Sequence, residues 1–170
     1  MAREFKNVQA QIDIYGSLIV QRLGDQLDAN NTNASGSLKG SIELTVKPES
    51  KGFIIDALQY WQAVDEGTKP HFVPKSALLK WLSYPNVRDK VRFGATDKAF
   101  GEREANSFAY LIQRKILRYG TEGTNFAKNV MESDLIDNMV GSLQDAAFED
   151  YSAILDGIID NYNNETKTRK

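Results

Sequence analysis

The chain has 170 residues, which suits one domain of ordinary size with a substantial core. It holds no cysteine and one histidine, which excludes disulfides, iron–sulfur clusters, thiolate zinc sites, a cysteine nucleophile and multi-histidine metal sites. Its formal net charge of −2 argues against a dedicated nucleic-acid binder. It has neither an apolar run near the ~20 residues that span a bilayer nor a secretory signal, so we expect a soluble protein made in the cytoplasm.

Charge is distributed unevenly along the chain. Residues 69–118 carry eleven basic and four acidic residues, a net of +7. Residues 129–166 carry nine acidic residues and no basic one, a net of −9. These segments either neutralise each other within one chain, meet head to tail between neighbouring copies, or are simply solvated helix faces.

The first predicted element is an amphipathic helix over 7–29. Its apolar residues recur at steps of three and four, and Asn7 is placed to cap its start. Gly16 inside the helix costs about 1 kcal/mol relative to alanine, which the apolar stripe has to offset. The small, polar residues of 30–40 then predict a mobile loop.

A β-hairpin follows. Apolar and polar residues alternate over 42–46, which is typical of a half-buried strand. Turn-forming residues occupy 48–52, and the apolar run 53–58 forms the return strand with Asp56 facing outward.

Two helices are predicted in the middle of the chain. The first begins at Pro74, which suits a first helical turn, and ends at Pro85. Residues 84–100 form a basic segment with little regular pattern. The second helix covers 101–118, and Gly120 fits the position just past its end.

The last third of the chain predicts a short helix near Phe126, capped by Thr124 or Asn125, and a long acidic helix over 133–163. At about 1.5 Å per residue the long helix would measure roughly 45 Å. It therefore either breaks at Gly141 or Gly157, or extends as an arm whose apolar stripe needs a partner surface. Together the elements predict one α+β domain over 1–170 with long N- and C-terminal helices, a small antiparallel hairpin and two middle helices.

Catalytic patterns are weak. Asp65, Glu66, His71 and Ser76 contain the residue types of a hydrolase triad, but a triad is defined by geometry and no nucleophile elbow is present. Glu102 and Glu104 diverge on a helix, so they do not form a paired site. We therefore expect no catalytic, cofactor-binding or metal-binding residues.

A basic stretch with interleaved aromatics favours at most non-specific contact with passing DNA. Phosphate contact and base stacking use such residues, while the acidic final third opposes binding. The stretch comprises Arg88, Lys90, Arg92, Lys98, Arg103, Arg114, Lys115 and Arg118, with Tyr84, Phe93 and Phe100 between them.

Two glycine–threonine corners stand out. DEGTKPHFVP occupies 65–74 and YGTEGTNF occupies 119–126. Glycine permits a sharp reversal with positive φ, and the threonine hydroxyl can bond the backbone beyond it. Each corner therefore marks a defined change of direction between a packed element and a helix.

Taken in order, these motifs resemble the tail-completion proteins at the head–tail neck of long-tailed bacteriophages. The run YWQAVDEGT at 60–68 is similar to their tyrosine, valine–acid–glycine–threonine signature. KPHFVP at 69–74, LLKWL at 78–82 and the helix ending in GTEGTNF at 120–126 are also similar to family forms. The resemblance covers about 5–160; the longer 84–100 segment and the long, acidic last helix depart from it.

The resemblance implies a non-enzymatic virion protein that forms a homo-oligomeric ring, typically a hexamer. Such a ring helps to join the portal–adaptor (connector) complex of the filled head to the tail. The turn and interface residues that the motifs single out are Trp61, Asp65, Glu66, Gly67, Thr68, His71, Phe72, Gly120, Thr121, Gly123, Thr124 and Phe126.

A ring needs two different surfaces of one chain to meet. We expect the acidic helix over 133–163 of one subunit to pack on the basic region 69–118 of its neighbour, with an apolar stripe supplying affinity. The stripe comprises Ile136, Val140, Leu143, Tyr151, Ile154 and Ile158. The alternatives are a non-viral α+β interaction adaptor and, third, a small hydrolase using Asp65, Glu66 and His71.

Overall fold

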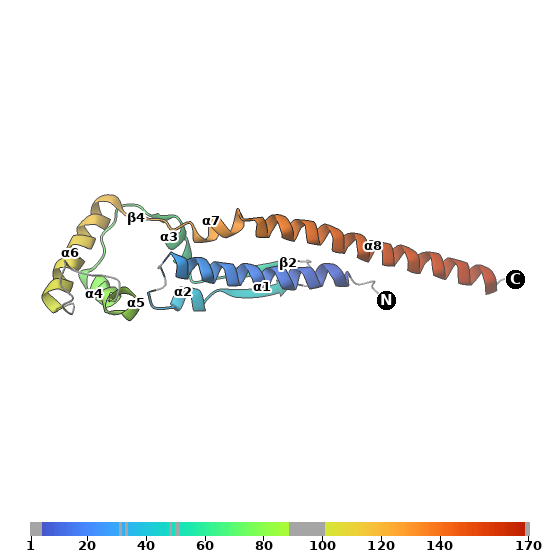
Figure 1. Ribbon diagram of the computed structural model, residues 1–170, viewed down its shortest axis with the longest axis horizontal. Coiled ribbons are helices and arrows are strands. Elements are labelled where there is room, and N and C mark those ends of the chain that lie inside the picture. Colours follow the sequence, from blue (N-terminus) through green and yellow to red (C-terminus); the bar gives the residue numbers. More distant parts are fainter. Residues whose placement is uncertain are drawn as a thin grey trace. The chain divides into compact units, whose positions relative to one another are not determined.

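A computed structural model describes residues 5–30, 32, 34–47, 49, 52–88 and 101–168. The fold is α+β, with long helices at both ends of the chain and a small antiparallel hairpin (Figure 1), as the sequence predicts. The chain divides into two compact units. One comprises Met1–Arg22, Glu43–Asp56 and Val130–Lys170, and the other comprises Leu23–Ile42 and Ala57–Asn129.

The first unit is built from most of α1 (Lys6–Ala29), the hairpin of β1 (Glu43–Lys47) and β2 (Gly52–Asp56), and α8 (Asp134–Thr168). The strands pair antiparallel from Glu43↔Asp56 to Lys47↔Gly52. Alternate side chains of β1 are half-buried and exposed, which is the period of two that a one-sided strand requires. The hairpin was therefore predictable from alternation.

Gly16 lies where α1 approaches β1. A Cβ at this position would come within 2.9 Å of Leu44 Cδ1. The glycine's cost to the helix is therefore offset by close packing between the helix and the strand.

α1 and α8 are joined through a buried carboxylate. Asp150, 6% exposed, accepts hydrogen bonds from the backbone N–H groups of Asn7 at 3.2 Å and Val8 at 3.0 Å. Tyr15 adds a 2.8 Å hydrogen bond to Ser142. Asn7 therefore does not cap α1 from outside, as the sequence suggested, because α1 already begins at Lys6 and Asp150 serves its first amides.

The second unit holds the shorter elements. These are α2 (Ser37–Gly40), α3 (Trp61–Asp65), β3 (Gly67–Thr68), α4 (Lys75–Ser83), α5 (Pro85–Arg88), α6 (Glu102–Tyr119), β4 (Thr121–Glu122) and most of α7 (Phe126–Met131). Charges on α6 complement its dipole, with Glu102 and Glu104 in the first turn and Arg118 in the last.

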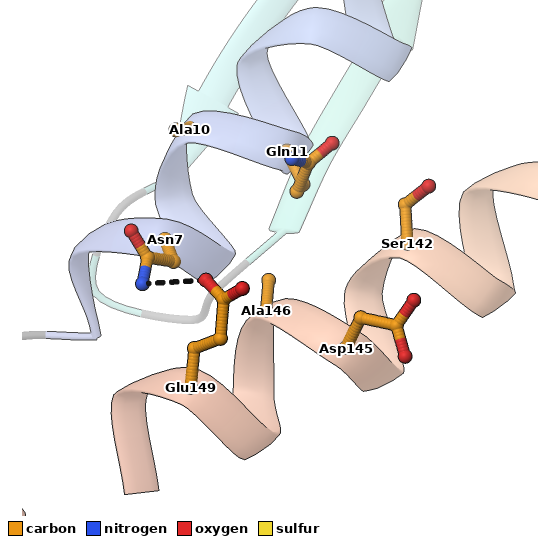
Figure 2. A pocket seen from close by; sticks show the side chains of 7 residues that line it. All are labelled: Asn7, Ala10, Gln11, Ser142, Asp145, Ala146 and Glu149. Carbon is orange, nitrogen blue, oxygen red and sulfur yellow. Dashed lines mark hydrogen bonds between the residues drawn. The ribbon is translucent and has the colours of Figure 1, made fainter. Parts of the chain in front are cut away.

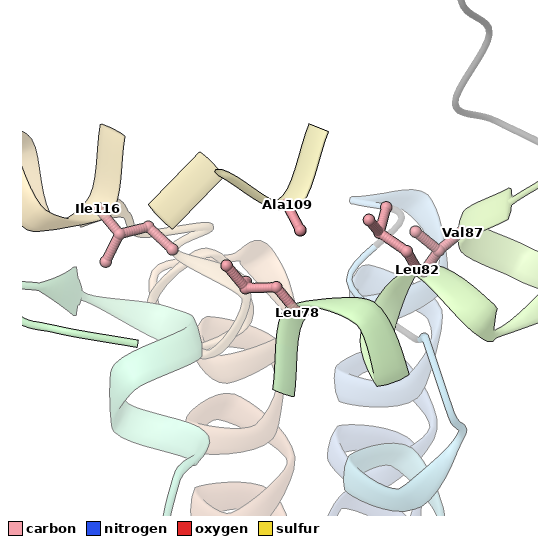
Figure 3. Packing of buried hydrophobic residues seen from close by; sticks show 5 residues of the cluster. All are labelled: Leu78, Leu82, Val87, Ala109 and Ile116. Carbon is pink, nitrogen blue, oxygen red and sulfur yellow. The ribbon is translucent and has the colours of Figure 1, made fainter. Parts of the chain in front are cut away.

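The core of the second unit lies between α4, α5 and α6. Its buried members are Leu78, Leu82, Val87, Ala109 and Ile116 (Figure 3). Ala109 is fully buried, which lets α6 approach α4 closely. Gln113 Nε2 then donates to the carbonyl oxygen of Val73 at 2.7 Å and fixes α6 against the segment before α4.

Two short helices correct the sequence predictions. The segment 30–40 contains the helical turn α2, because Leu38 is buried and anchors it. Pro85 ends α4 but also starts α5, whose Val87 joins the core. The rest of the basic segment, residues 89–100 with Lys90, Arg92, Phe93, Lys98 and Phe100, lies outside the described residues.

α8 is one unbroken helix of 35 residues, longer than the predicted 133–163. It does not break at Gly141, where a Cβ would meet nothing within 4 Å. Among the described residues no helix is long and apolar enough to cross a membrane.

Asp150→Ala should destabilise the fold by about 1–2 kcal/mol, because the first amides of α1 lose their acceptor. Urea denaturation followed by circular dichroism measures the loss. Asp150→Asn, which keeps one acceptor oxygen, should lose less. Asp145→Ala, at an exposed position of the same helix, is the matched control; equal losses in the two alanine variants would remove the capping role.

Candidate functional site

The structure brings the two glycine–threonine corners together. β3 and β4 pair antiparallel, with Gly67 opposite Glu122 and Thr68 opposite Thr121. Thr124 N–H donates to the carbonyl oxygen of Val64 at 3.0 Å and extends the contact. We call residues 64–68 and 120–127 the corner pair. The sequence predicted both corners but gave no sign that they pair.

Three glycines make this backbone approach possible. A Cβ at Gly67 would collide with the carbonyl oxygen of Thr121, and one at Gly120 with that of Thr68. A Cβ at Gly123 would collide with the carbonyl oxygen of Asp65. Gly120 also has φ 75° and ψ −158°, a region that is essentially confined to glycine.

The threonine hydroxyls bond across the corner pair. Thr68 Oγ1 lies 2.9 Å from Thr121 Oγ1 and accepts a hydrogen bond from Thr121 N–H at 3.2 Å. Thr124 Oγ1 donates to the carbonyl oxygen of Val64 at 3.0 Å. The side chains therefore reinforce the same contact that the backbone makes.

Asp65 ties the corner pair to α7. Its carboxylate is 7% exposed and its Oδ1 accepts a hydrogen bond from Ala127 N–H at 2.8 Å, in the first turn of α7. Its carbonyl oxygen accepts from Asn125 N–H at 2.9 Å. Asn125 has a φ of 52°, so the chain turns sharply there. The predicted capping of α7 by Thr124 or Asn125 is thus replaced by a cap from α3.

The other residues that the two corner motifs single out differ in how far they are buried. Phe126 is buried, Trp61 is half-buried, and Glu66, His71 and Phe72 are exposed. His71 Nδ1 lies 2.9 Å from the carbonyl oxygen of Lys69 and 3.3 Å from Thr68 Oγ1. His71 thereby closes the turn after β3.

The predicted hydrolase residues have structural partners. The Asp65 carboxylate is used in the α7 cap, and His71 Nδ1 is used in the turn. Ser76 is exposed in the first turn of α4. Within the described part of the chain, no group of three or more histidine, cysteine or acidic side chains could hold a metal ion.

Two small cavities lie among the described residues. One, of about 220 Å³, lies between α1 and α8 and is lined by Asn7, Ala10, Gln11, Ser142, Asp145, Ala146 and Glu149 (Figure 2). Asn7 Nδ2 donates to Glu149 Oε2 across it at 3.2 Å. The other, of about 250 Å³, is lined by Leu38, Tyr60, Val64, Trp81, Tyr84, Thr32 and residues 34–37.

The predicted stripe on α8 does not form one continuous surface. Ile136, Leu143 and Ile154 are half-buried, whereas Val140, Tyr151 and Ile158 are exposed. A second exposed series shares Tyr151 and Ile158 with the predicted stripe. It runs through Phe148, Tyr151, Leu155, Ile158, Ile159 and Tyr162. Sequence reasoning missed Phe148, because helical spacing does not reveal which apolar face the fold covers.

α6 also exposes both apolar and charged side chains. Its inward face carries Ala109 and Ile116, while Tyr110, Leu111 and Leu117 are each about half exposed. The exposed cations of the same helix are Arg103, Arg114, Lys115 and Arg118. Among the described residues, α8 thus combines acidic with exposed apolar side chains, and α6 combines basic with exposed apolar ones.

Comparison with known proteins found no match. No protein-family model fits the chain, and neither the curated proteins nor the solved structures include one that is significantly similar. Function therefore has to be inferred from the chain's own residues and surfaces.

Gly120→Ala should destabilise the fold by more than about 2 kcal/mol, because it adds a clash to a strained backbone conformation. Gly141→Ala, in the open interior of α8, should instead stabilise by about 0.5–1 kcal/mol. Thermal unfolding of both variants measures the contrast. A Gly120→Ala protein as stable as the parent would mean that the corner pair does not constrain the fold.

Proposed function

We propose that the chain is a structural protein of the phage neck, a ring-forming tail-completion component that joins the portal–adaptor complex to the tail. The observation that carries the proposal is the corner pair. The two motifs that resemble the tail-completion family, separated by about 50 residues, form a single hydrogen-bonded unit. Two short motifs that also contact each other in the fold support the resemblance more strongly than either motif does alone.

The chemistry of the corner pair supports a structural role. Its polar side chains bond the backbone or each other, and its glycines serve close packing. A hydrolase needs a nucleophile, a base and an orienting group in mutual contact. Asp65 and His71 instead stabilise a helix start and a turn.

The surfaces support assembly of identical copies. A closed ring forms when two different surfaces of one chain are complementary, since each copy then binds two neighbours. α8 and α6 expose side chains of opposite charge, and both helices also expose apolar side chains. Apolar burial supplies affinity in such contacts, and charge selects the partner.

Further partners follow from the proposed position. The ring would touch connector or adaptor proteins on the head side and tail proteins on the other. The basic side chains of α6 would allow non-specific contact with DNA passing through the neck. The virion neck is the proposed location.

A stop codon early in the gene should leave the phage with filled heads and finished tails that do not join. Negative-stain electron microscopy of the lysate scores the separated parts, and supply of the wild-type chain in trans should restore joined particles. Immunogold labelling of complete particles should mark the head–tail junction.

Normal particles from the mutant, or particles without the chain, would contradict the proposal. Absence from purified virions together with a tight complex with a host protein would favour the adaptor alternative. If His71→Ala abolished an activity of an otherwise folded protein, the hydrolase alternative would be favoured.

A further inference from the structure

Four apolar side chains in the distal half of α8 follow the spacing of a coiled-coil seam. They succeed each other at steps of three, four and three, so they occupy the a and d positions of successive heptads. We call these residues the distal stripe, and they are Phe148 (a), Tyr151 (d), Leu155 (a) and Ile158 (d). Tyr162 continues the series by a further step of four. Such a series is typical of a helix that packs against other helices along its length.

α1, which packs on α8, reaches only to the start of this region. The two helices run in opposite directions, since Tyr15 bonds Ser142 whereas Asn7 bonds Asp150. α1 begins one residue before Asn7, so α8 continues for about five turns past the start of α1. Residues 158–164 of α8 are all exposed. The described residues of the chain itself therefore cover little of the distal stripe.

The exposed area of this region is that of an interface. Its six large apolar side chains are each between 51% and 74% exposed, and they are Phe148, Tyr151, Leu155, Ile158, Ile159 and Tyr162. At about 200 Å² for a whole large side chain, these fractions leave roughly 700 Å² exposed per copy. A stable interface buries about 800 Å² per partner, whereas the largest apolar patch of a typical monomer is ~300–600 Å². The ring of Phe5 meets only an edge of Tyr151, with centroids 5.5 Å apart. The area is therefore large enough for association.

The charges of α8 lie away from the distal stripe. Positions e and g flank a seam and meet the neighbouring helix. Here they are uncharged, and they are Ser152, Ile154, Ile159 and Asn161. The acids occupy the outer b and f positions, and they are Glu149, Asp156 and Asp160. A basic partner would therefore find no anion beside the seam, and a second α8 would bring no like charges together there. The seam thus fits another copy of itself.

The central residues of the stripe favour a bundle of more than two helices. Leu155 lies at an a position and Ile158 at a d position, an order that shifts parallel coiled coils from two strands toward trimers and tetramers. Ile159, at the neighbouring e position, is 55% exposed and widens the seam on one side. Each helix can therefore contact two neighbours.

We propose that the distal stripe of α8 packs on the same stripe of at least two other copies, in a parallel bundle with all copies in register. The partner surface is thus α8 itself, and not the basic region 69–118 that the sequence suggested. This inference takes from the proposed function only the premise that copies assemble, and it names the segment that joins them. Each helix of such a bundle has a neighbour on either side, as in a closed ring.

Two matched substitutions in the full chain test the seam. Leu155→Asp places a charge within the distal stripe. Ala153→Asp places the same charge two residues earlier, at an exposed f position outside the seam. In sedimentation velocity over the micromolar range, the parent should form trimers or larger assemblies. Leu155→Asp should associate at least about tenfold more weakly, as expected when a central apolar anchor is lost. Ala153→Asp should assemble like the parent, and circular dichroism should show that both variants are folded.

The direction of the helices is tested by introduced thiols, since the chain contains no cysteine. Phe148→Cys and Leu155→Cys lie seven residues, or about 10 Å, apart along the helix. Each should form a disulfide-linked dimer on mild oxidation, because a parallel bundle brings identical positions together. Asp156→Cys, at an outer position, should not. Non-reducing gel electrophoresis measures the products, and in an antiparallel arrangement at most one of the two stripe positions could link to itself.

Other results overturn the inference. A parent that is monomeric or only dimeric throughout the concentration range would exclude the bundle. Parental assembly of Leu155→Asp, or equal weakening by Ala153→Asp, would exclude the distal stripe as the seam. Failure of either stripe cysteine to link to itself would exclude parallel packing in register. Particle joining and immunogold labelling judge the neck role separately, so the two proposals can fail independently.

Discussion

The fold of the second unit depends on the approach of two backbone segments that leaves no room for a Cβ. Gly67, Gly120 and Gly123 each face a carbonyl oxygen of the opposite segment. Because the backbones touch, the threonine hydroxyls can bond across the gap and Asp65 can reach the first turn of α7. The directions in which α6 ends and α7 begins are thereby fixed by one contact.

Two buried aspartates solve the same physical problem in the two units. A buried carboxylate is costly unless it accepts hydrogen bonds, and a helix N-terminus has amides without partners. Asp65 serves α7, and Asp150 serves α1. Each pairing satisfies both groups and also benefits from the helix dipole. Acidic residues that would attract attention as catalytic candidates thus have a structural explanation.

The exposure of individual side chains changes the interpretation of the charge separation along the chain. A stretch of nine acidic residues is compatible with a solvated helix, but α8 combines that charge with exposed aromatic and aliphatic side chains. α6 combines exposed cations with exposed apolar groups in the same way. Each helix thus combines charge of one sign with exposed apolar side chains, and charge of one sign on a surface selects among partners more than it adds affinity.

Periodicity alone determined the α+β class, the hairpin and the long helices, since spacings of two and of three to four residues reflect strand and helix geometry directly. It also marked Gly120 as the residue past the end of α6. Only the tertiary structure decided that the corners pair, that Asp150 caps α1 and that Leu38 anchors α2, because these contacts join residues with no local signal. The exposed face of α8 belongs to this second group, since a sequence shows that a stripe is apolar but not whether its own chain covers it.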